Sequence, residues 1–89
     1  MSGSQDVVMY STGWCPYCLR ARALLDRKGV AVIEIKVDEN PAERATMLSR
    51  TSGQRTVPQI FIGDRHVGGF DDLYALDKAG ELDKLLGRA

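Results

Sequence analysis

The stretch VVMYSTGWCPYC (residues 7–18) decides how this chain folds. Its first four residues, 7–10, form a short apolar run that is typical of a strand buried on both faces. From Cys15 to Lys28, apolar residues recur at the spacing of a helix. Pro16 suits the first helical position and the next glycine after Lys28 suits the helix end. The stretch therefore predicts a strand that passes into a helix, with a cysteine at the junction.

A second strand follows this helix. Ile33, Ile35 and Val37 alternate with charged residues, which is the period-two pattern of a strand with one face in the core and the other in solvent. A strand-helix-strand unit of this length favours a parallel pair of strands joined by a right-handed crossover.

The rest of the chain predicts a second helix, a hairpin and a last helix. These elements fall at residues 42–51 (helix), 59–62 and 65–67 (strands) and 73–78 (helix), with a short helical tail after Gly80. We therefore expect an α/β domain with the element order βαβαββα, in which helices flank a four-stranded mixed sheet.

The composition fits one small globular domain. The chain has 89 residues, of which 44% are hydrophobic and 27% charged, and both values are ordinary for a folded protein. We expect a single domain over residues 6–88, preceded by a disordered lead-in over residues 1–5, and we expect this domain to be a monomer.

Charge and hydropathy limit the expected partners. Twelve basic and twelve acidic side chains give a formal net charge of zero, and no basic run exceeds Arg27-Lys28, so nucleic acid is not an expected partner. No segment approaches the roughly 20 apolar residues that span a bilayer, and the first residues lack the pattern of a signal peptide. We therefore expect a cytoplasmic protein without a membrane partner.

Cys15 and Cys18 are the only cysteines, and three roles compete for them. A permanent structural disulfide is disfavoured in a reducing compartment, and its loop is too short to restrict the unfolded chain much. A closed zinc site needs about four ligands, whereas the chain adds only His66 and carboxylates to the two thiols. A CxxC pair that opens the helix of a strand-helix-strand unit is instead typical of thiol-disulfide exchange.

The place of each cysteine in the helix predicts its role. Cys15 lies where the helix begins, so unpaired backbone N–H groups and the helix dipole should stabilise its thiolate. Cys18 lies one turn further in and lacks this advantage. We expect Cys15 to be the exposed nucleophile and Cys18 the buried resolving cysteine, which closes an intramolecular disulfide.

Three motifs together resemble the dithiol glutaredoxins. They are Cys15-Pro16-Tyr17-Cys18, Thr56-Val57-Pro58 and Gly68-Gly69-Phe70-Asp71-Asp72-Leu73, in the order and at about the spacing of that family. The resemblance covers roughly residues 7–86. It implies a thioredoxin-like fold, no tightly bound cofactor, and glutathione as co-substrate.

The resemblance also implies a glutathione site. Pro58 matches the cis-proline of the family, and the backbone of Val57 would pair with the cysteinyl residue of glutathione. The N–H groups at the start of the last helix would hold the γ-glutamyl carboxylate, and Gly69 would let the ligand approach closely. Tyr17 would flank the glycyl end, and Arg55 would bind its carboxylate. The implied site residues are Tyr17, Arg55, Thr56, Val57, Pro58, Gly69, Phe70, Asp71 and Asp72.

One position departs from the family pattern. Many members carry a lysine three residues before the first cysteine, where this chain has Thr12, and Arg22 is a candidate for the missing cation. Trp14 either gates access to the nucleophile or covers a loop as a partly buried side chain. His66 is expected to be a solvated strand residue and not a general base.

Together these features predict a glutathione-dependent thiol-disulfide oxidoreductase that acts on protein disulfides and on protein-glutathione mixed disulfides. Two alternatives stay open. An electron carrier reduced by a flavoprotein would lack the second and third motifs, and both are present. The other alternative is a module that holds an iron-sulfur cluster between two subunits. By the same family resemblance, Pro16 beside Cys15 disfavours it. We assign no metal ligands.

Overall fold

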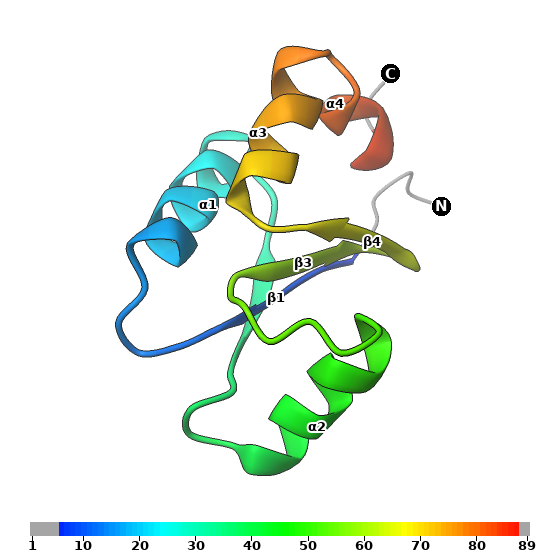
Figure 1. The fold of residues 1–89 in the computed structure, drawn as a ribbon. Helices are drawn as coiled ribbons and strands as arrows, with labels where there is room; N and C mark the ends of the chain where they lie inside the picture. The colour runs from blue at the N-terminus through cyan, green and yellow to red at the C-terminus, as the bar shows by residue number, and fades with distance from the viewer. Residues whose placement is uncertain (1–5, 88–89) are drawn as a thin grey trace.

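The computed structural model describes residues 6–87 and has the predicted order of elements (Figure 1). They are β1 (Val7–Ser11), α1 (Pro16–Arg27), β2 (Val32–Lys36), α2 (Pro41–Arg50), β3 (Gln59–Ile62), β4 (Arg65–Gly68), α3 (Phe70–Lys78) and α4 (Leu82–Leu85). The expected lead-in at residues 1–5 and the end of the expected domain at residue 88 lie outside the described residues.

The four strands form one mixed sheet in the order β2-β1-β3-β4, as predicted. β1 runs parallel to β2, with Val7 opposite Val32, and antiparallel to β3, with Val7 opposite Ile62. β3 and β4 form the antiparallel hairpin. Figure 1 shows α1 and α3 side by side on one face of the sheet and α2 on the other. The carboxyl end of the central strand β1 thus leads directly into α1.

The larger core lies between the sheet and the helices α1, α3 and α4. Alternate residues of β1 and β3 face it, and the inner face of α1 supplies a cysteine as one of its buried side chains. Its fully buried members include Val7, Met9, Leu25, Ile60, Leu73 and Leu82. Cys18, with 3% of its surface exposed, is therefore part of the hydrophobic core.

The smaller core lies under α2 and leaves part of the sheet uncovered. Met47 from α2 packs with Tyr10, Val37 and Phe61. The prediction that Ile33 faces the core is wrong, because 54% of its surface is exposed. Ile33 has no place in the cluster around Met47, since α2 is only ten residues long and covers the sheet elsewhere.

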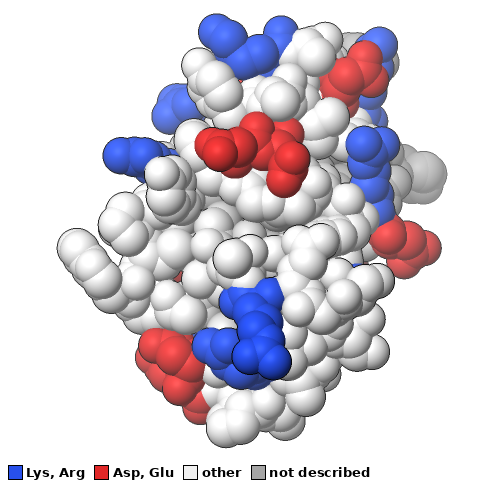
Figure 2. All heavy atoms as spheres, in the orientation of Figure 1, with Lys and Arg blue, Asp and Glu red and all other residues white. Residues whose placement is uncertain are grey.

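Charged side chains form small separate groups on the face that Figure 2 shows, with uncharged surface between them. This distribution agrees with the zero net charge of the sequence. Within residues 6–87 no helix has the length and apolarity that a membrane crossing requires.

One cation links the three helices of the larger core. Lys28, just after α1, pairs with Asp77 of α3 at 2.7 Å and with Asp83 of α4 at 3.3 Å. The hydrogen bond to Asp77, followed by that to Asp83, raises the pKa of Lys28 above its ordinary value of 10.5. The folded state therefore favours the charged form of this lysine.

Replacing this cation predicts a pH-dependent loss of stability. Lys28→Met removes both pairs, so its free energy of unfolding is expected to lie below that of the wild type from neutral pH up to about pH 10. Because the pKa is raised in the folded state, the stabilisation is lost as the pH rises through 10.5 and above, and the two proteins converge. Urea unfolding at several pH values measures the difference. A gap that widens above pH 10.5 would contradict the assignment.

Candidate active site

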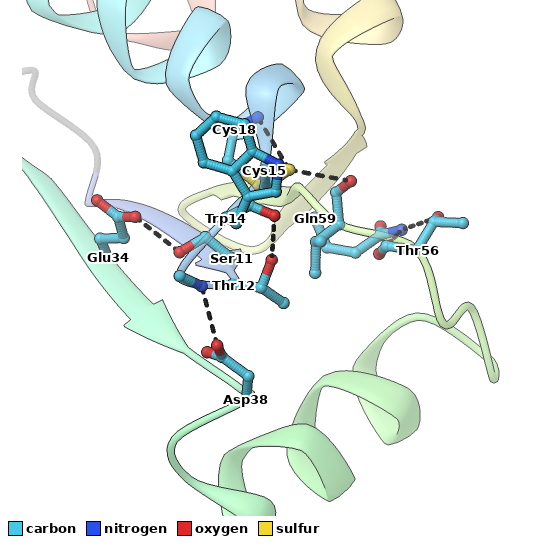
Figure 3. Close-up of a disulfide and its surroundings, with 11 residues drawn as sticks. Ser11, Thr12, Trp14, Cys15, Cys18, Glu34, Asp38, Thr56 and Gln59 are labelled. Carbon is cyan, nitrogen blue, oxygen red and sulfur yellow. Dashed lines mark hydrogen bonds between the residues drawn. A yellow bond between two sulfur atoms is a disulfide. The ribbon is translucent and has the colours of Figure 1, made fainter.

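The cysteine pair lies at the N-terminus of α1 (Figure 3). Cys15 is the N-cap residue, in an extended conformation, and Pro16 is the first residue of the helix. The Sγ of Cys15 accepts a hydrogen bond from the backbone N–H of Cys18 at 3.1 Å, and the two cysteines form a disulfide. The sulfur of Cys15 thus takes the position of a helix cap.

The two cysteines differ in accessibility in the predicted direction, although less than expected. Cys15 has 9% of its surface exposed and Cys18 has 3%. The expectation of an exposed nucleophile is therefore wrong for this disulfide form, in which Cys15 is largely covered.

A loop from another part of the chain lies against this sulfur. The Val57–Pro58 peptide bond is cis, as the family resemblance implied. The carbonyl oxygen of Val57 lies 3.8 Å from the Sγ of Cys15. The backbone of residues 56–58 is thereby within reach of any group that is bonded to Cys15.

The segment before Cys15 is held by its own hydrogen bonds (Figure 3). The Gly13 N–H donates to the carboxylate of Asp38 at 3.0 Å, and the hydroxyl of Thr12 donates to the carbonyl of Trp14 at 3.3 Å. Trp14 is 82% exposed, so it does not cover the loop as a partly buried side chain.

Arg22 does not replace the missing lysine. Its guanidinium pairs with Glu34 of β2 at 2.6 Å and with Asp26 at 3.3 Å. Glu34 in turn accepts a hydrogen bond from the hydroxyl of Ser11 at 2.7 Å. The expected role of Arg22 near the nucleophile is therefore wrong, because partners on α1 and β2 hold its charge.

A cleft of about 330 Å³ lies beside the cysteine pair. Its size is at the lower end of the range for small-molecule sites. Its lining residues are Tyr17, Gln54, Thr56, Val57, Pro58, Gln59, Gly69, Phe70, Asp71 and Asp72. Eight of the nine residues that the resemblance implied are thus brought together, while Arg55 does not line the cleft and two glutamines, Gln54 and Gln59, do.

The start of α3 forms one end of the cleft. The N–H of Gly69 donates to the carboxylate of Asp72 at 3.1 Å, so Asp72 caps the helix. Both Asp71 and Asp72 are exposed. The N–H groups of the first helical turn have no acceptor within the helix and can hold an anion. Both the capping role and an anion site are compatible with this geometry.

Gln59, at the start of β3, is a buried residue that sequence reasoning missed. Only 1% of its surface is exposed. Its amide N–H groups donate to the Thr56 carbonyl at 3.0 Å, to the Thr56 hydroxyl at 3.2 Å and to the side-chain oxygen of Gln54 at 3.2 Å. The Gln59 side chain therefore holds the loop of residues 54–58, whose other side faces Cys15.

His66 completes this network, and its expected solvated state is wrong. Its Nε2 lies 2.7 Å from the side-chain oxygen of Gln59, and its ring stacks on Phe61 with 4.7 Å between centroids. Since an amide oxygen only accepts, Nε2 must carry the proton in this contact. One indication of these contacts is present in the sequence, which is that His66 lies opposite Phe61 across the predicted hairpin.

A disulfide-forming pair at the N-terminus of the first helix of a strand-helix-strand unit, next to a cis-proline loop, defines a thioredoxin-like thiol-disulfide redox domain. Within residues 6–87 there is no group of three or more His, Cys, Asp or Glu side chains arranged to hold a metal ion.

Known proteins narrow this class. The family profile described as Glutaredoxin matches residues 7–67. A glutaredoxin from Pseudomonas aeruginosa is 60% identical over 80 residues, covering 90% of this chain and 94% of that protein. The solution structure of glutaredoxin from Brucella melitensis, 51% identical, matches with a TM-score of 0.83 over 97% of this chain and 92% of that one. The crystal structure of a buckwheat glutaredoxin-glutathione complex, 34% identical, also gives 0.83, over 96% and 83%.

The chain belongs to the glutaredoxin family, as the three motifs predicted, and is an oxidoreductase of that family.

Replacement of two neighbouring glycines by alanine is predicted to have unequal effects on stability. Gly68 has φ +116°, and an added Cβ would overlap the Asp72 carboxylate, whereas a Cβ on Gly69 would meet only the Pro58 carbonyl, at 3.5 Å. Gly68→Ala is expected to lower the free energy of unfolding by about 1–3 kcal/mol. Gly69→Ala should change it by less than about 0.5 kcal/mol. Urea unfolding compares the two variants, and equal losses would contradict the assigned strain.

Removing the buried amide predicts a further loss of stability. Gln59→Leu leaves the Thr56 carbonyl and His66 without their partner, so a loss of about 1–3 kcal/mol is expected. Gln54→Ala is the matched control, because it removes only one acceptor of the same amide from an exposed residue, and about 0.5 kcal/mol or less is expected. Denaturant unfolding measures both, and a tolerated Gln59→Leu would show that the network contributes little.

Proposed function

We propose that this protein is a glutathione-dependent thiol-disulfide oxidoreductase that reduces protein-glutathione mixed disulfides and protein disulfides. The observation that carries this proposal is the position of the Cys15 sulfur. It caps α1, lies 3.8 Å from the carbonyl of Val57, and adjoins a cleft that ends at the start of α3.

Glutathione suits the chemistry of this cleft. It carries a central thiol, one carboxylate at each end and one ammonium group at its γ-glutamyl end. With its sulfur at Cys15, its cysteinyl backbone can pair with the N–H and C=O of Val57 in the manner of a short strand. Its γ-glutamyl carboxylate can then accept from the N–H groups at the start of α3, and the exposed carboxylate of Asp71 is available for the ammonium group.

The remaining end of glutathione has fewer partners. Tyr17 lines the cleft and can flank the glycyl residue. Arg55 is exposed and is not among the residues that line the cleft, so its contact with the glycyl carboxylate stays a prediction. The buckwheat relative, whose structure is a complex with glutathione, supports the choice of ligand.

In the monothiol route, one cysteine is sufficient. The Cys15 thiolate attacks the glutathionyl sulfur of a mixed disulfide, the bond between that sulfur and the substrate sulfur breaks, and the substrate thiolate leaves and takes a proton from solvent. A second glutathione, as thiolate, attacks the glutathionyl sulfur on Cys15, which frees Cys15 and forms oxidised glutathione. The net reaction consumes one free glutathione thiol. Its sulfur is oxidised as it joins the glutathionyl group in oxidised glutathione, and the substrate sulfur is reduced to a thiol.

In the dithiol route, Cys18 resolves the intermediate. The Cys15 thiolate attacks one sulfur of a protein disulfide and forms a mixed disulfide with it, while the original bond breaks and the other substrate sulfur leaves as a thiolate. Cys18 then attacks Cys15, which releases the second substrate thiol and closes the Cys15–Cys18 bridge. Two glutathione molecules reopen this bridge and leave as oxidised glutathione. The short separation of the two cysteines along one helical turn supports this step.

Serine substitutions test these roles. Cys15→Ser is expected to lower the turnover of glutathionylated 2-mercaptoethanol, coupled to glutathione reductase, by about 10³-fold or more, because the nucleophile is lost. Cys18→Ser should retain that activity within about threefold and lose the reduction of a protein disulfide such as that of insulin.

Two results would contradict the proposal. Wild-type protein without glutathione-dependent turnover, but active with a flavoprotein reductase, would identify an electron carrier instead. Full activity of Cys15→Ser would remove this cysteine as the nucleophile.

A further inference from the structure

Three aromatic side chains form a row that leads away from the cleft. The ring of Tyr17, at the start of α1, lies 6.4 Å from that of Phe70, at the start of α3, and Phe70 lies 5.9 Å from Tyr74 (centroid distances). Tyr17 is 53% exposed and Tyr74 is 46% exposed. The row crosses between α1 and α3, which are neighbours in Figure 1.

A cation lies against each end of this row. The guanidinium carbon of Arg20 is 5.3 Å from the ring centroid of Tyr17, and the Nζ of Lys78 is 5.6 Å from that of Tyr74. Neither cation forms an ion pair with any residue from 6 to 87, in contrast to Lys28, whose charge is held by two carboxylates. We call these five residues, Arg20, Tyr17, Phe70, Tyr74 and Lys78, the aromatic row.

The glutathione cleft accounts for only two of the five residues of the row. Tyr17 and Phe70 line the cleft, whereas Tyr74, Lys78 and Arg20 do not. Tyr74 and Lys78 follow Phe70 along α3 by one and two turns, so they continue the surface outward from the redox site. Core packing does not explain them either, because both side chains are exposed.

Exposed aromatic rings beside unpaired cations are typical of protein interfaces. Tyrosine buries a large area at a low cost in side-chain entropy, and Tyr and Arg are enriched where binding energy is concentrated. A cation that already stacks on a ring can also accept a carboxylate from a partner without giving up that contact.

We propose that the two ends of the aromatic row, Arg20 on α1 and Tyr74 with Lys78 on α3, dock the polypeptide that carries the substrate cysteine, while Tyr17 and Phe70 between them face glutathione. These two ends favour segments with apolar and acidic side chains near that cysteine. This inference rests on the proposed function. Continuity with the cleft argues for a polypeptide, because only a chain attached to the reacting sulfur would extend from Cys15 past Phe70. Complementarity to two unpaired cations argues for acidic side chains.

The acidic residues at the start of α3 define where those side chains go. Asp72 is occupied by the N–H of Gly69, and Asp71 is exposed beside the cleft. Asp71 repels an acidic residue placed directly next to the substrate cysteine. The preferred acids therefore lie further along the segment, at the distance of Arg20 or Lys78.

Matched peptides test this preference. The probes are glutathionylated peptides in which a central cysteine is flanked on each side by leucine and then by glutamate, with companions that carry glutamine or lysine in place of glutamate. We expect wild-type protein to show a kcat/KM about tenfold higher for the glutamate peptide than for the lysine peptide, with the glutamine peptide between them. The ratio should shrink between about 0.02 M and about 0.5 M salt.

Variants of the row connect the preference to its residues. The double variant Arg20→Glu with Lys78→Glu should reverse the order of the glutamate and lysine peptides, and Lys78→Gln should reduce the preference if the double variant fails to fold. Tyr74→Ala should lower kcat/KM about fivefold for all three peptides. None of these changes should alter the turnover of glutathionylated 2-mercaptoethanol by more than about twofold, since that substrate does not extend beyond the cleft to Arg20, Tyr74 or Lys78.

Two exposed residues outside the row serve as controls. Ile33→Ala removes an exposed apolar side chain from β2. Lys84→Glu makes on α4 the same change of charge that the single variant Lys78→Glu makes on α3, and Lys78→Glu is expected to reduce the preference for the glutamate peptide. Both controls should behave as the wild type with every substrate. Equal loss in Lys84→Glu and Lys78→Glu would overturn the proposal in favour of a net-charge effect.

The outcomes separate this inference from the function on which it rests. Absence of glutathione-dependent turnover of the small mixed disulfide would refute the proposed function. Normal turnover of that substrate, with no discrimination among the peptides or with discrimination unchanged in the row variants, would overturn the docking surface alone. Binding of the row to vesicles of phosphatidylglycerol, lost in the double variant and without any peptide preference, would likewise overturn it and identify a membrane surface as the partner.

Discussion

The hydrogen bond from the backbone N–H of Cys18 to the sulfur of Cys15 joins the fold of this protein to its chemistry. It satisfies a helix N–H that otherwise has no partner, and it orients toward the sulfur the end of the helix that stabilises negative charge. Pro16 fixes the backbone for this start, and Cys18 anchors the first turn in the core. The nucleophile is therefore positioned by the same contacts that begin α1, and the parallel pairing of β1 with β2 sets where that helix begins.

Much of the fold could be predicted because chain-breaking residues fall at element ends. Pro16, Gly29 and Pro41 mark boundaries that the structure repeats within a residue or two. The start of α3 was predicted three residues too late, since its cap depends on Asp72 reaching back to Gly69, a contact that periodicity does not register. Most of the residues that line the cleft were predicted from the three motifs. That prediction depended on the family resemblance. Local sequence pattern cannot show that residues 56–58 approach Cys15, because the two segments are about forty residues apart.

The errors share one physical cause. Arg22, Ile33 and His66 were judged from their neighbours in sequence, but their surroundings come from other elements: Glu34 across a helix-strand contact, the limited reach of α2, and Gln59 across the hairpin. Gln59 went unnoticed for the same reason, since a glutamine within a strand gives no sign that its amide is buried with four polar contacts. The local sequence pattern indicates which face of a helix or strand is apolar. Whether a polar side chain can be buried there depends on partners that other elements supply.

The burial of Cys18 among apolar side chains has a thermodynamic consequence. Oxidation and folding form a closed cycle, so the difference in folding free energy between the oxidised and reduced proteins equals the difference between the free energies of forming the disulfide in the folded and unfolded chains. Cys18 belongs to the same core cluster as Leu25 and Leu73, so this core packs around a bridge in one redox state and around a thiol in the other. A core residue that stabilises the oxidised and reduced proteins by different amounts therefore shifts the reduction potential of the cysteine pair. It does so from the hydrophobic interior, without contact to substrate or glutathione.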